Sequence, residues 1–189
     1  MHAADVAASL ALLDELRAAA PPLPDGVALD VGAGIGRVAQ GVLLPRFEAV
    51  ELVESEPAFL EVARASLPAP RVRAAHECGL QDFAPPPGAR YAAVWVQWVL
   101  NYVTDAGVLG FLRRAAAALQ PAGVLLVKES VAREEGGFFA DVAECSITRT
   151  EAHFRALFAE AGLEVAAAQL QPGMPRGTFA VRTFALRPR

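Results

Sequence analysis

Three glycines at alternate positions follow a short apolar run that ends in an acid, in the sequence LDVGAGIGR at residues 29 to 37. Because glycine has no side chain, such a loop exposes backbone N–H groups at the carboxyl end of a strand, where a following helix can present its positive end to a ligand. We therefore expect Gly32 and Gly34 to lie against an electron-rich ligand. The competing interpretation is a simple strand-to-helix turn, since glycines at this spacing occur in many turns.

Glu54 favours ligand binding over a simple turn. It closes the next apolar run, eighteen positions after Gly36, where nucleoside-binding α/β domains place an acid that accepts hydrogen bonds from ribose hydroxyls. An NAD enzyme remains possible, although the usual G-x-G-x-x-G fingerprint has its third glycine one position later. S-adenosylmethionine has no pyrophosphate, and its carboxylate and ammonium suit Arg37, Asp30 and the loop amides. The spacing therefore favours a methyl donor.

Two later segments carry polar residues at predicted strand ends. In CGLQDF (78 to 83), Leu80 is a candidate to cover an adenine face, and Gln81 or Asp82 is a candidate to meet the adenine amine. The alternative is an ordinary polar loop. Gln97 interrupts an apolar strand, and a buried amide needs a hydrogen-bond partner. Its place at the strand end favours a ligand contact over a core role. Trp98 is a candidate substrate wall or a core residue.

Apolar strand patterns alternate with helical patterns along the chain and must position these residues. Strands are expected at 27–32, 48–54, 71–76, 91–98 and 123–130, and helices at 37–44, 57–67, 106–119 and 150–162. Such alternation implies right-handed crossovers and a largely parallel sheet with helices on both faces. Two last strands, 163–170 and 178–187, are joined by the turn-rich QPGMPRG and predict a hairpin that adds an antiparallel strand.

Composition limits the class of protein. The 189 residues suit one domain, 1–189, with an N-terminal helix over residues 1–20. Lys and Arg number 17 against 21 Asp and Glu, so no general basic field can hold a nucleic acid, and a cationic partner fits better. No run of about 18 uncharged apolar residues predicts a membrane span. Cys78 and Cys145 lack metal-ligand spacing, and we interpret them as reduced thiols of a cytoplasmic or nuclear protein that binds no metal.

From about residue 5 to its end, the chain resembles the class I S-adenosylmethionine-dependent methyltransferases. Within that class it is similar to the enzymes that methylate the α-amino group of X-Pro-Lys or X-Pro-Arg N-termini. The narrowest matching segments are GLQDF (79–83), WVQWV (95–99) and LQPAGVLLVKE (119–129). The resemblance implies a Rossmann-like α/β fold with a mostly parallel seven-stranded sheet and an antiparallel C-terminal strand. It also implies S-adenosylmethionine as donor and S-adenosylhomocysteine as product.

The resemblance also assigns site residues. The implied donor contacts are Gly32, Arg37, Glu54, Leu80, Gln81 and Gln97, and the implied peptide-channel residues are Trp98, Ser130, Asp141 and Glu144. The family usually has Asn at position 130, Asp at 144 and 54, and His where this chain has Tyr102, which we also place at the substrate. Its members carry an aromatic-containing segment further upstream, whereas 31 residues precede Gly32 here. That lid is either missing, supplied by another segment, or lost to an incomplete gene model. If it is missing, we expect weaker donor retention or a different substrate range.

Methyl transfer to an amine requires a neutral nitrogen, and an α-amino group has a pKa of about 8. Asp141 is the first candidate for the general base and Glu144 the second, with Ser130 beside them. Their three-residue spacing puts both acids on one face if the segment is helical, although FADVAE also reads as an ordinary acidic helix start. The same acids would attract a basic third residue of the substrate.

Two other functions remain open from the sequence. A small-molecule methyltransferase would share the donor residues, and an inactive module would bind donor or peptide without turnover. We expect the chain to act as a monomer.

Overall fold

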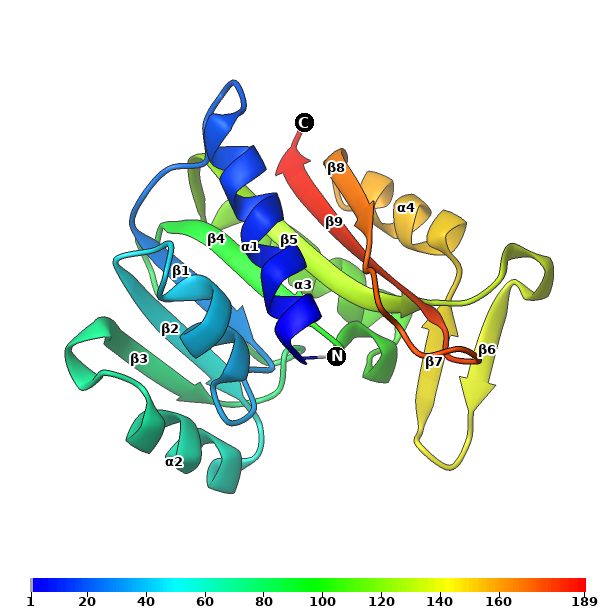
Figure 1. Cartoon of the computed structure of the whole chain (residues 1–189), viewed down its shortest axis with the longest axis horizontal. Coiled ribbons are helices and arrows are strands. Elements are labelled where there is room, and N and C mark those ends of the chain that lie inside the picture. Colours follow the sequence, from blue (N-terminus) through cyan, green and yellow to red (C-terminus); the bar gives the residue numbers. More distant parts are fainter. Residues whose placement is uncertain (1) are drawn as a thin grey trace.

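A seven-stranded sheet in the order β3-β2-β1-β4-β5-β9-β8 runs through the centre of the computed structural model, which describes residues 2–189 (Figure 1). The strands are β1 (Val27–Val31), β2 (Ala49–Glu54), β3 (Val72–Glu77), β4 (Tyr91–Gln97), β5 (Leu119–Val131), β8 (Leu163–Leu170) and β9 (Ala180–Pro188). The first five are mutually parallel, and β9 lies antiparallel between β5 and β8. The predicted strands, the hairpin and the fold class are confirmed.

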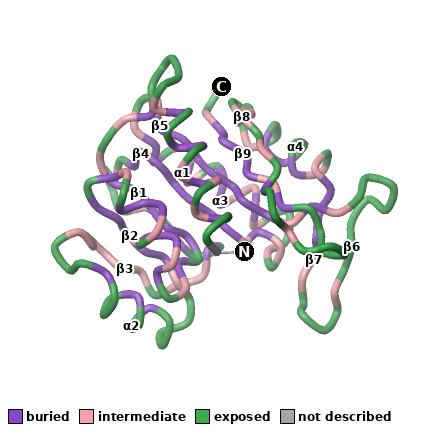
Figure 2. Tube along the Cα trace, in the orientation of Figure 1, coloured by how far each residue is buried: buried purple, intermediate pink, exposed green. Residues whose placement is uncertain are grey.

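Helices cover both faces of the sheet, as the alternation predicted. The α-helices are α1 (His2–Ala18), α2 (Pro57–Ser66), α3 (Asp105–Ala117) and α4 (Glu151–Glu160). One core forms where α1 and α2 pack on side chains such as Ala28, and a second where α3 and α4 pack on alternate side chains such as Leu29. The period of two along each strand sends neighbouring residues to opposite cores. In Figure 2 the central strands are buried almost throughout.

Short helical turns complete the crossovers. They are a π-helical turn η1 (Ala39–Leu43) and three 3-10 turns, η2 (Ala69–Arg71), η3 (Leu100–Tyr102) and η4 (Glu134–Gly136). The helix expected at 37–44 is therefore mainly the η1 turn, in which the Leu44 N–H donates to the Ala39 carbonyl at 2.9 Å. Within residues 2–189, no helix has the length and apolar character needed to cross a membrane.

One prediction about local structure is wrong. The acidic segment around Asp141 is not helical but forms a two-stranded hairpin of β6 (Phe138–Asp141) and β7 (Ser146–Arg149). A carboxylate oxygen of Asp141 accepts hydrogen bonds from the N–H groups of Ala143 and Glu144, which turns the chain back on itself. Cys145 follows with a φ of 48°, which ends the turn. Figures 1 and 2 show this hairpin as a largely exposed arm beyond the end of β5.

Candidate active site

The glycine loop and Glu54 meet at the carboxyl ends of β1 and β2. Glu54 accepts hydrogen bonds from the N–H of Gly34 at 2.8 Å and of Glu56 at 2.9 Å. Gly32 has a φ of 70°, and a Cβ there would lie 2.2 Å from Cγ2 of Val99, so this position requires glycine. A Cβ on Gly34 would meet nothing within 4 Å, which leaves its backbone open on one side. Gly32, Gly34 and Glu54 thus lie together, as expected of a nucleoside site.

Asp30 holds the chain that follows this loop. It is buried, and its carboxylate accepts a hydrogen bond from the Ala39 N–H at 2.9 Å. Burial raises the pKa of Asp30 to about 7. The carboxyl therefore orients the η1 turn that follows the glycine loop.

Arg37 joins the glycine loop to the end of β4. Its guanidinium lies 5.5 Å from the centroid of the Trp98 ring, and one of its nitrogens lies 2.6 Å from a carboxylate oxygen of Asp5. Trp98 has a φ of 58°, an uncommon conformation for a bulky residue. This backbone turn places Trp98 beside a predicted donor contact.

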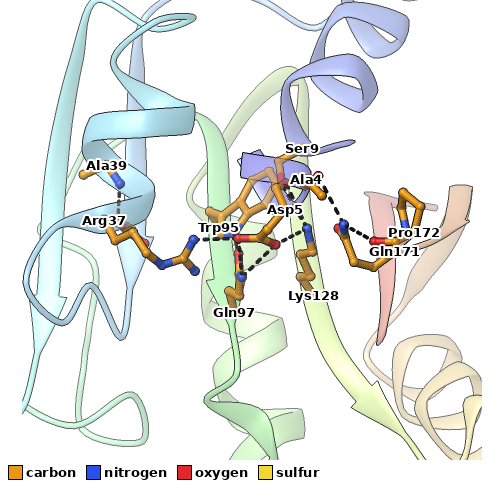
Figure 3. Close-up of polar contacts among 11 residues, drawn as sticks. Ala4, Asp5, Ser9, Arg37, Ala39, Trp95, Gln97, Lys128, Gln171 and Pro172 are labelled. Carbon is orange, nitrogen blue, oxygen red and sulfur yellow. Dashed lines mark hydrogen bonds and ion pairs between the residues drawn. The ribbon is translucent and has the colours of Figure 1, made fainter. Parts of the chain in front are cut away.

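A buried polar network, which we call the α1 cluster, lies under the N-terminal helix (Figure 3). Its members are Asp5, Ser9, Arg37, Gln97 and Lys128. Lys128 lies 2.6 Å from a carboxylate oxygen of Asp5 and donates to the Ser9 hydroxyl at 3.0 Å. The Gln97 amide donates to Asp5 at 3.3 Å and accepts from the Trp95 indole N–H at 3.1 Å. Gln97 therefore has the hydrogen-bond partners that its burial demanded.

The charges of the α1 cluster are held by mutual pairing. Burial raises the pKa of Asp5, but Lys128 and Arg37 outweigh it and hold that pKa below its ordinary value. Burial and the nearby Arg37 together lower the pKa of Lys128 more than Asp5 raises it. Asp5 is therefore a carboxylate that ties α1 to both β5 and the glycine loop.

The loop after β3 is fixed by its backbone. Leu80 is buried in the core beneath α3, while the Gln81 side chain is exposed. Their carbonyl groups accept hydrogen bonds from Arg114 of α3, at 3.2 and 2.9 Å. The loop thus stays at the same edge of the sheet as Glu54, and its contact with adenine stays a prediction.

Two cavities meet at Trp98 and Ser130, which line both of them. The larger has a volume of about 1310 Å³ and lies between the end of β5, the base of the β6–β7 hairpin and the segment before β9. The smaller has a volume of about 300 Å³ and is lined by Trp98, Asn101, Tyr102, Glu129, Ser130, Ser146 and Thr148. Three predicted substrate residues, Trp98, Tyr102 and Ser130, are therefore brought together.

Asp141 and Glu144 are not brought to these cavities. Both lie at the turn of the β6–β7 hairpin, and neither lines either cavity. The geometry assumed for them, one face of a helix, is absent because the segment is a hairpin. Their part in the reaction stays a prediction.

Asn101, Glu129, Ser146 and Thr148 of the smaller cavity were not predicted from the sequence, and two of them, Glu129 and Asn101, have an unpaired buried oxygen among the described residues. One carboxylate oxygen of Glu129 accepts hydrogen bonds from the N–H groups of Val99 and Leu100, at 2.7 and 2.8 Å, and its second oxygen has no partner within residues 2–189. The side-chain oxygen of Asn101 is also buried, with no partner in the part of the chain that the structure describes. Burial raises the pKa of Glu129 to about 8. The signal for Glu129 was present, since Lys128 and Glu129 interrupt an otherwise apolar strand.

Comparison with known proteins places this arrangement in a family. The family described as "AdoMet dependent proline di-methyltransferase" matches residues 1–187. "N-terminal Xaa-Pro-Lys N-methyltransferase 1" of Danio rerio is 41% identical over 164 residues, which cover 86% of this chain and 72% of that protein. The protein of the same name from Homo sapiens is 39% identical over 162 residues, covering 85% and 71%.

Solved structures agree with the fold. A SAM-dependent methyltransferase from Leishmania major superposes with a TM-score of 0.90 at 29% identity, covering 98% of this chain and 72% of that one. A 1,6-didemethyltoxoflavin-N1-methyltransferase from Burkholderia thailandensis, solved with S-adenosylhomocysteine, has a TM-score of 0.74 at 22% identity and covers 97% of this chain and 79% of its own. The second likeness concerns the fold alone.

Proposed function

We propose, since the chain belongs to the AdoMet-dependent proline di-methyltransferase family, that it methylates the α-amino group of protein N-termini of the Xaa-Pro-Lys or Xaa-Pro-Arg type. S-adenosylmethionine is its methyl donor, and S-adenosylhomocysteine is the product. The observation that carries the proposal is the arrangement around Trp98. This residue contacts Arg37 of the glycine loop and also lines both cavities, so donor and acceptor can meet there.

The donor would be held along the carboxyl ends of β1, β2 and β4. Glu54 suits the ribose hydroxyls because it already lies against the Gly34 amide. Arg37 suits the donor carboxylate, and Gln97 lies in hydrogen-bond contact with the same Asp5 that pairs with Arg37. Leu80 and Gln81 are assigned to the adenine. The open side of Gly34, where a Cβ would meet no atom, leaves room for this ligand.

The peptide would lie across Trp98 and Ser130, with Tyr102 beside its first residue. Side chains of both charges line this path. Glu134, Glu135 and Glu151 line the larger cavity with Arg133 and Arg182, of which Arg182 pairs with Glu151, and Asp141 and Glu144 lie on the hairpin beyond it. An ammonium or guanidinium on the third residue would be attracted by these carboxylates. We assign Asp141 and Glu144 to this attraction.

The donor supplies a methyl group on a positively charged sulfur, so the chain has three tasks. It must align the amine nitrogen with the methyl carbon, exclude water and remove one proton from the ammonium. The buried ends of β4 and β5 position the residues near the reacting atoms. Trp98 is fixed by its backbone N–H, which donates to the Lys128 carbonyl at 3.0 Å.

Intact-mass analysis tests the proposal. A peptide beginning Ser-Pro-Lys is incubated with the protein and S-adenosylmethionine, beside the same peptide with an acetylated α-amine. We expect methyl-mass steps on the free peptide alone. Steps on neither peptide, with donor binding retained in calorimetry, would show that the acceptor is a different molecule, such as a small-molecule amine.

A further inference from the structure

We propose that the smaller cavity receives the substrate's α-amine, with Glu129 as the residue that accepts the ammonium proton and Asn101 as a second hydrogen-bond acceptor. This inference rests on the proposed function and specifies the acceptor half of its site. Neither residue was assigned from the sequence.

The wall of this cavity carries two acceptors that lack donors. The second carboxylate oxygen of Glu129 and the side-chain oxygen of Asn101 are both buried without a protein partner among the described residues. Glu129 is fully buried, and a buried polar atom without a partner costs free energy. A ligand that donates several N–H bonds would remove that cost. An amine or ammonium has this property, whereas a carboxylate or phosphate does not.

The cavity also lies where the reaction must occur. It shares Trp98 and Ser130 with the larger cavity, which offers a path for the rest of a peptide. Trp98 contacts Arg37, a predicted donor contact. An amine in the smaller cavity would therefore be near the donor while its peptide chain leaves through the larger cavity.

The environment of Glu129 matches proton transfer from an α-amine. Burial raises the pKa of Glu129 to about 8, despite its two backbone N–H partners and the nearby Arg149. An α-ammonium also has a pKa of about 8, so the two groups have similar proton affinities before they meet. Tyr102 is the other titratable side chain in the cavity lining, and Arg149 of β7 is the cation that acts on Glu129.

The proposed step conserves atoms and charge. An ammonium next to Glu129 lowers the pKa of that carboxyl, so the bound pair holds one proton between them. When the Glu129 carboxylate takes the proton, the N–H bond breaks, an O–H bond forms, and the amine regains its lone pair. That lone pair forms the N–C bond as the S–C bond of the donor breaks, which leaves S-adenosylhomocysteine and a methylated ammonium.

Asp141 is the competing proton acceptor, because it was the first candidate from the sequence. Its carboxylate is already engaged by the N–H groups of Ala143 and Glu144 at the hairpin turn, and it does not line the smaller cavity. Glu129 lines that cavity and has a free acceptor atom.

Kinetics across pH distinguish the two acids and a purely structural role. Glu129→Gln keeps an oxygen for the Val99 and Leu100 amides but cannot take a proton. We expect its kcat/KM on a Ser-Pro-Lys peptide to fall about 100-fold at pH 7. The loss should shrink to about tenfold or less at pH 9.5, where the amine is neutral without help. At pH 7, the kcat/KM of Asp141→Asn should fall less than that of Glu129→Gln.

Calorimetry gives a second readout that does not depend on turnover. Peptide binding is measured with S-adenosylhomocysteine present, at pH 7, in two buffers of different ionisation enthalpy. Free Glu129 and the free ammonium are both mostly protonated, whereas their complex holds one proton, so the wild type should release about one proton. Glu129→Gln should release almost none. Asn101→Ala should weaken peptide binding about fivefold and release the same proton as the wild type.

The control is Glu164→Gln, an exposed acid on the edge strand β8, which should match the wild type in every assay. A pH-independent loss in Glu129→Gln, or unchanged proton release, would overturn the assignment of Glu129. If Glu129→Gln does not fold, Asn101→Ala provides the test. An unchanged peptide affinity in Asn101→Ala would overturn the assignment of the smaller cavity to the α-amine. A wild type that neither binds nor methylates the peptide would overturn the proposed function as well.

Discussion

Two polar regions lie at neighbouring residues of one strand and differ in how completely they are paired. Lys128 belongs to the α1 cluster, where it meets Asp5 and Ser9. Glu129, the next residue, faces the opposite side of the sheet, where one of its oxygens has no partner among the residues that the structure describes. Both side chains are fully buried. The paired region is suited to holding the fold together, whereas the unpaired one is suited to a ligand that completes its hydrogen bonds.

The pairing of the α1 cluster also connects the fold to the donor site. Asp5 lies on α1, far from the glycine loop in sequence, yet it contacts Arg37, Gln97 and Lys128. Through Asp5, helix α1 therefore holds two predicted donor contacts, Arg37 and Gln97, in position. Asp5 lies in the predicted N-terminal helix, and its role near the donor site comes only from its contacts with residues of other elements.

Lys128→Met should produce the largest change in stability. Lys128 is the only lysine in the chain and is fully buried, so its loss leaves the Asp5 carboxylate with one fewer cation in a buried setting. We expect the free energy of unfolding in urea to fall by about 3–5 kcal/mol. Arg90→Met, at an exposed arginine, is the control and should change it little. An equal, small effect for both variants would mean that the α1 cluster does not stabilise the fold.

The unpaired region at Glu129 should be detected by how the free energy of unfolding changes with pH, not by its value at one pH. The pKa of Glu129 is about 8 in the folded protein and about 4.3 in an unfolded chain, so its stabilisation is complete below pH 4 and is lost as pH rises toward 8. From pH 5 to pH 8, the wild type should lose about 3.5 kcal/mol more than Glu129→Gln. Asp30, with its pKa raised to about 7, also makes stability fall as pH rises, but it does so equally in both proteins. Its contribution therefore cancels in the difference between them.

Urea unfolding of both proteins at several pH values measures this difference. Parallel curves for the wild type and Glu129→Gln would show that Glu129 has an ordinary pKa, and the contrast with the α1 cluster would then fail.

The sequence predicted most of the sheet because its strands are short apolar runs separated by helical patterns. It could also place Gly32, Gly34 and Glu54 together, since parallel strands end at one edge and the loop needs positive φ angles. It could not predict the contact between Asp5 and Lys128, which are 123 residues apart. Periodicity says which face a residue occupies but does not identify its partner on another element.

The hairpin was missed for a local reason. Its turn, DVAEC, contains no Gly, Pro or Asn, and Phe138 and Phe139 are adjacent instead of alternating with polar residues. Both phenylalanines are largely exposed, so burial does not impose the usual strand pattern. Asp141 supplies the turn through its own side chain, a function that competes with the role first expected of it.

Glu54→Ala should weaken donor binding without disturbing the acceptor cavity. Its carboxylate bonds the Gly34 and Glu56 amides and is assigned to the ribose hydroxyls, and hydrogen bonds to charged groups contribute about 1.5–3 kcal/mol. We expect the Kd for S-adenosylhomocysteine to rise about 30-fold in calorimetry. Glu61→Ala, an exposed acid on α2, should leave it unchanged. A Kd within twofold of the wild type for Glu54→Ala would remove Glu54 from the donor site.

The hairpin acids should have the smallest effect, because they are exposed or half-exposed and act on a distant charge. In Asp141→Asn combined with Glu144→Gln, the turn oxygen is kept while both charges are removed. The KM for a Ser-Pro-Lys peptide should rise about threefold at low salt and hardly at all at high salt. A peptide with Gln in the third position should not distinguish the variant from the wild type. A loss of kcat on both peptides would instead indicate that Asp141 accepts the proton of the reacting amine. Glu129 would then have a structural role only.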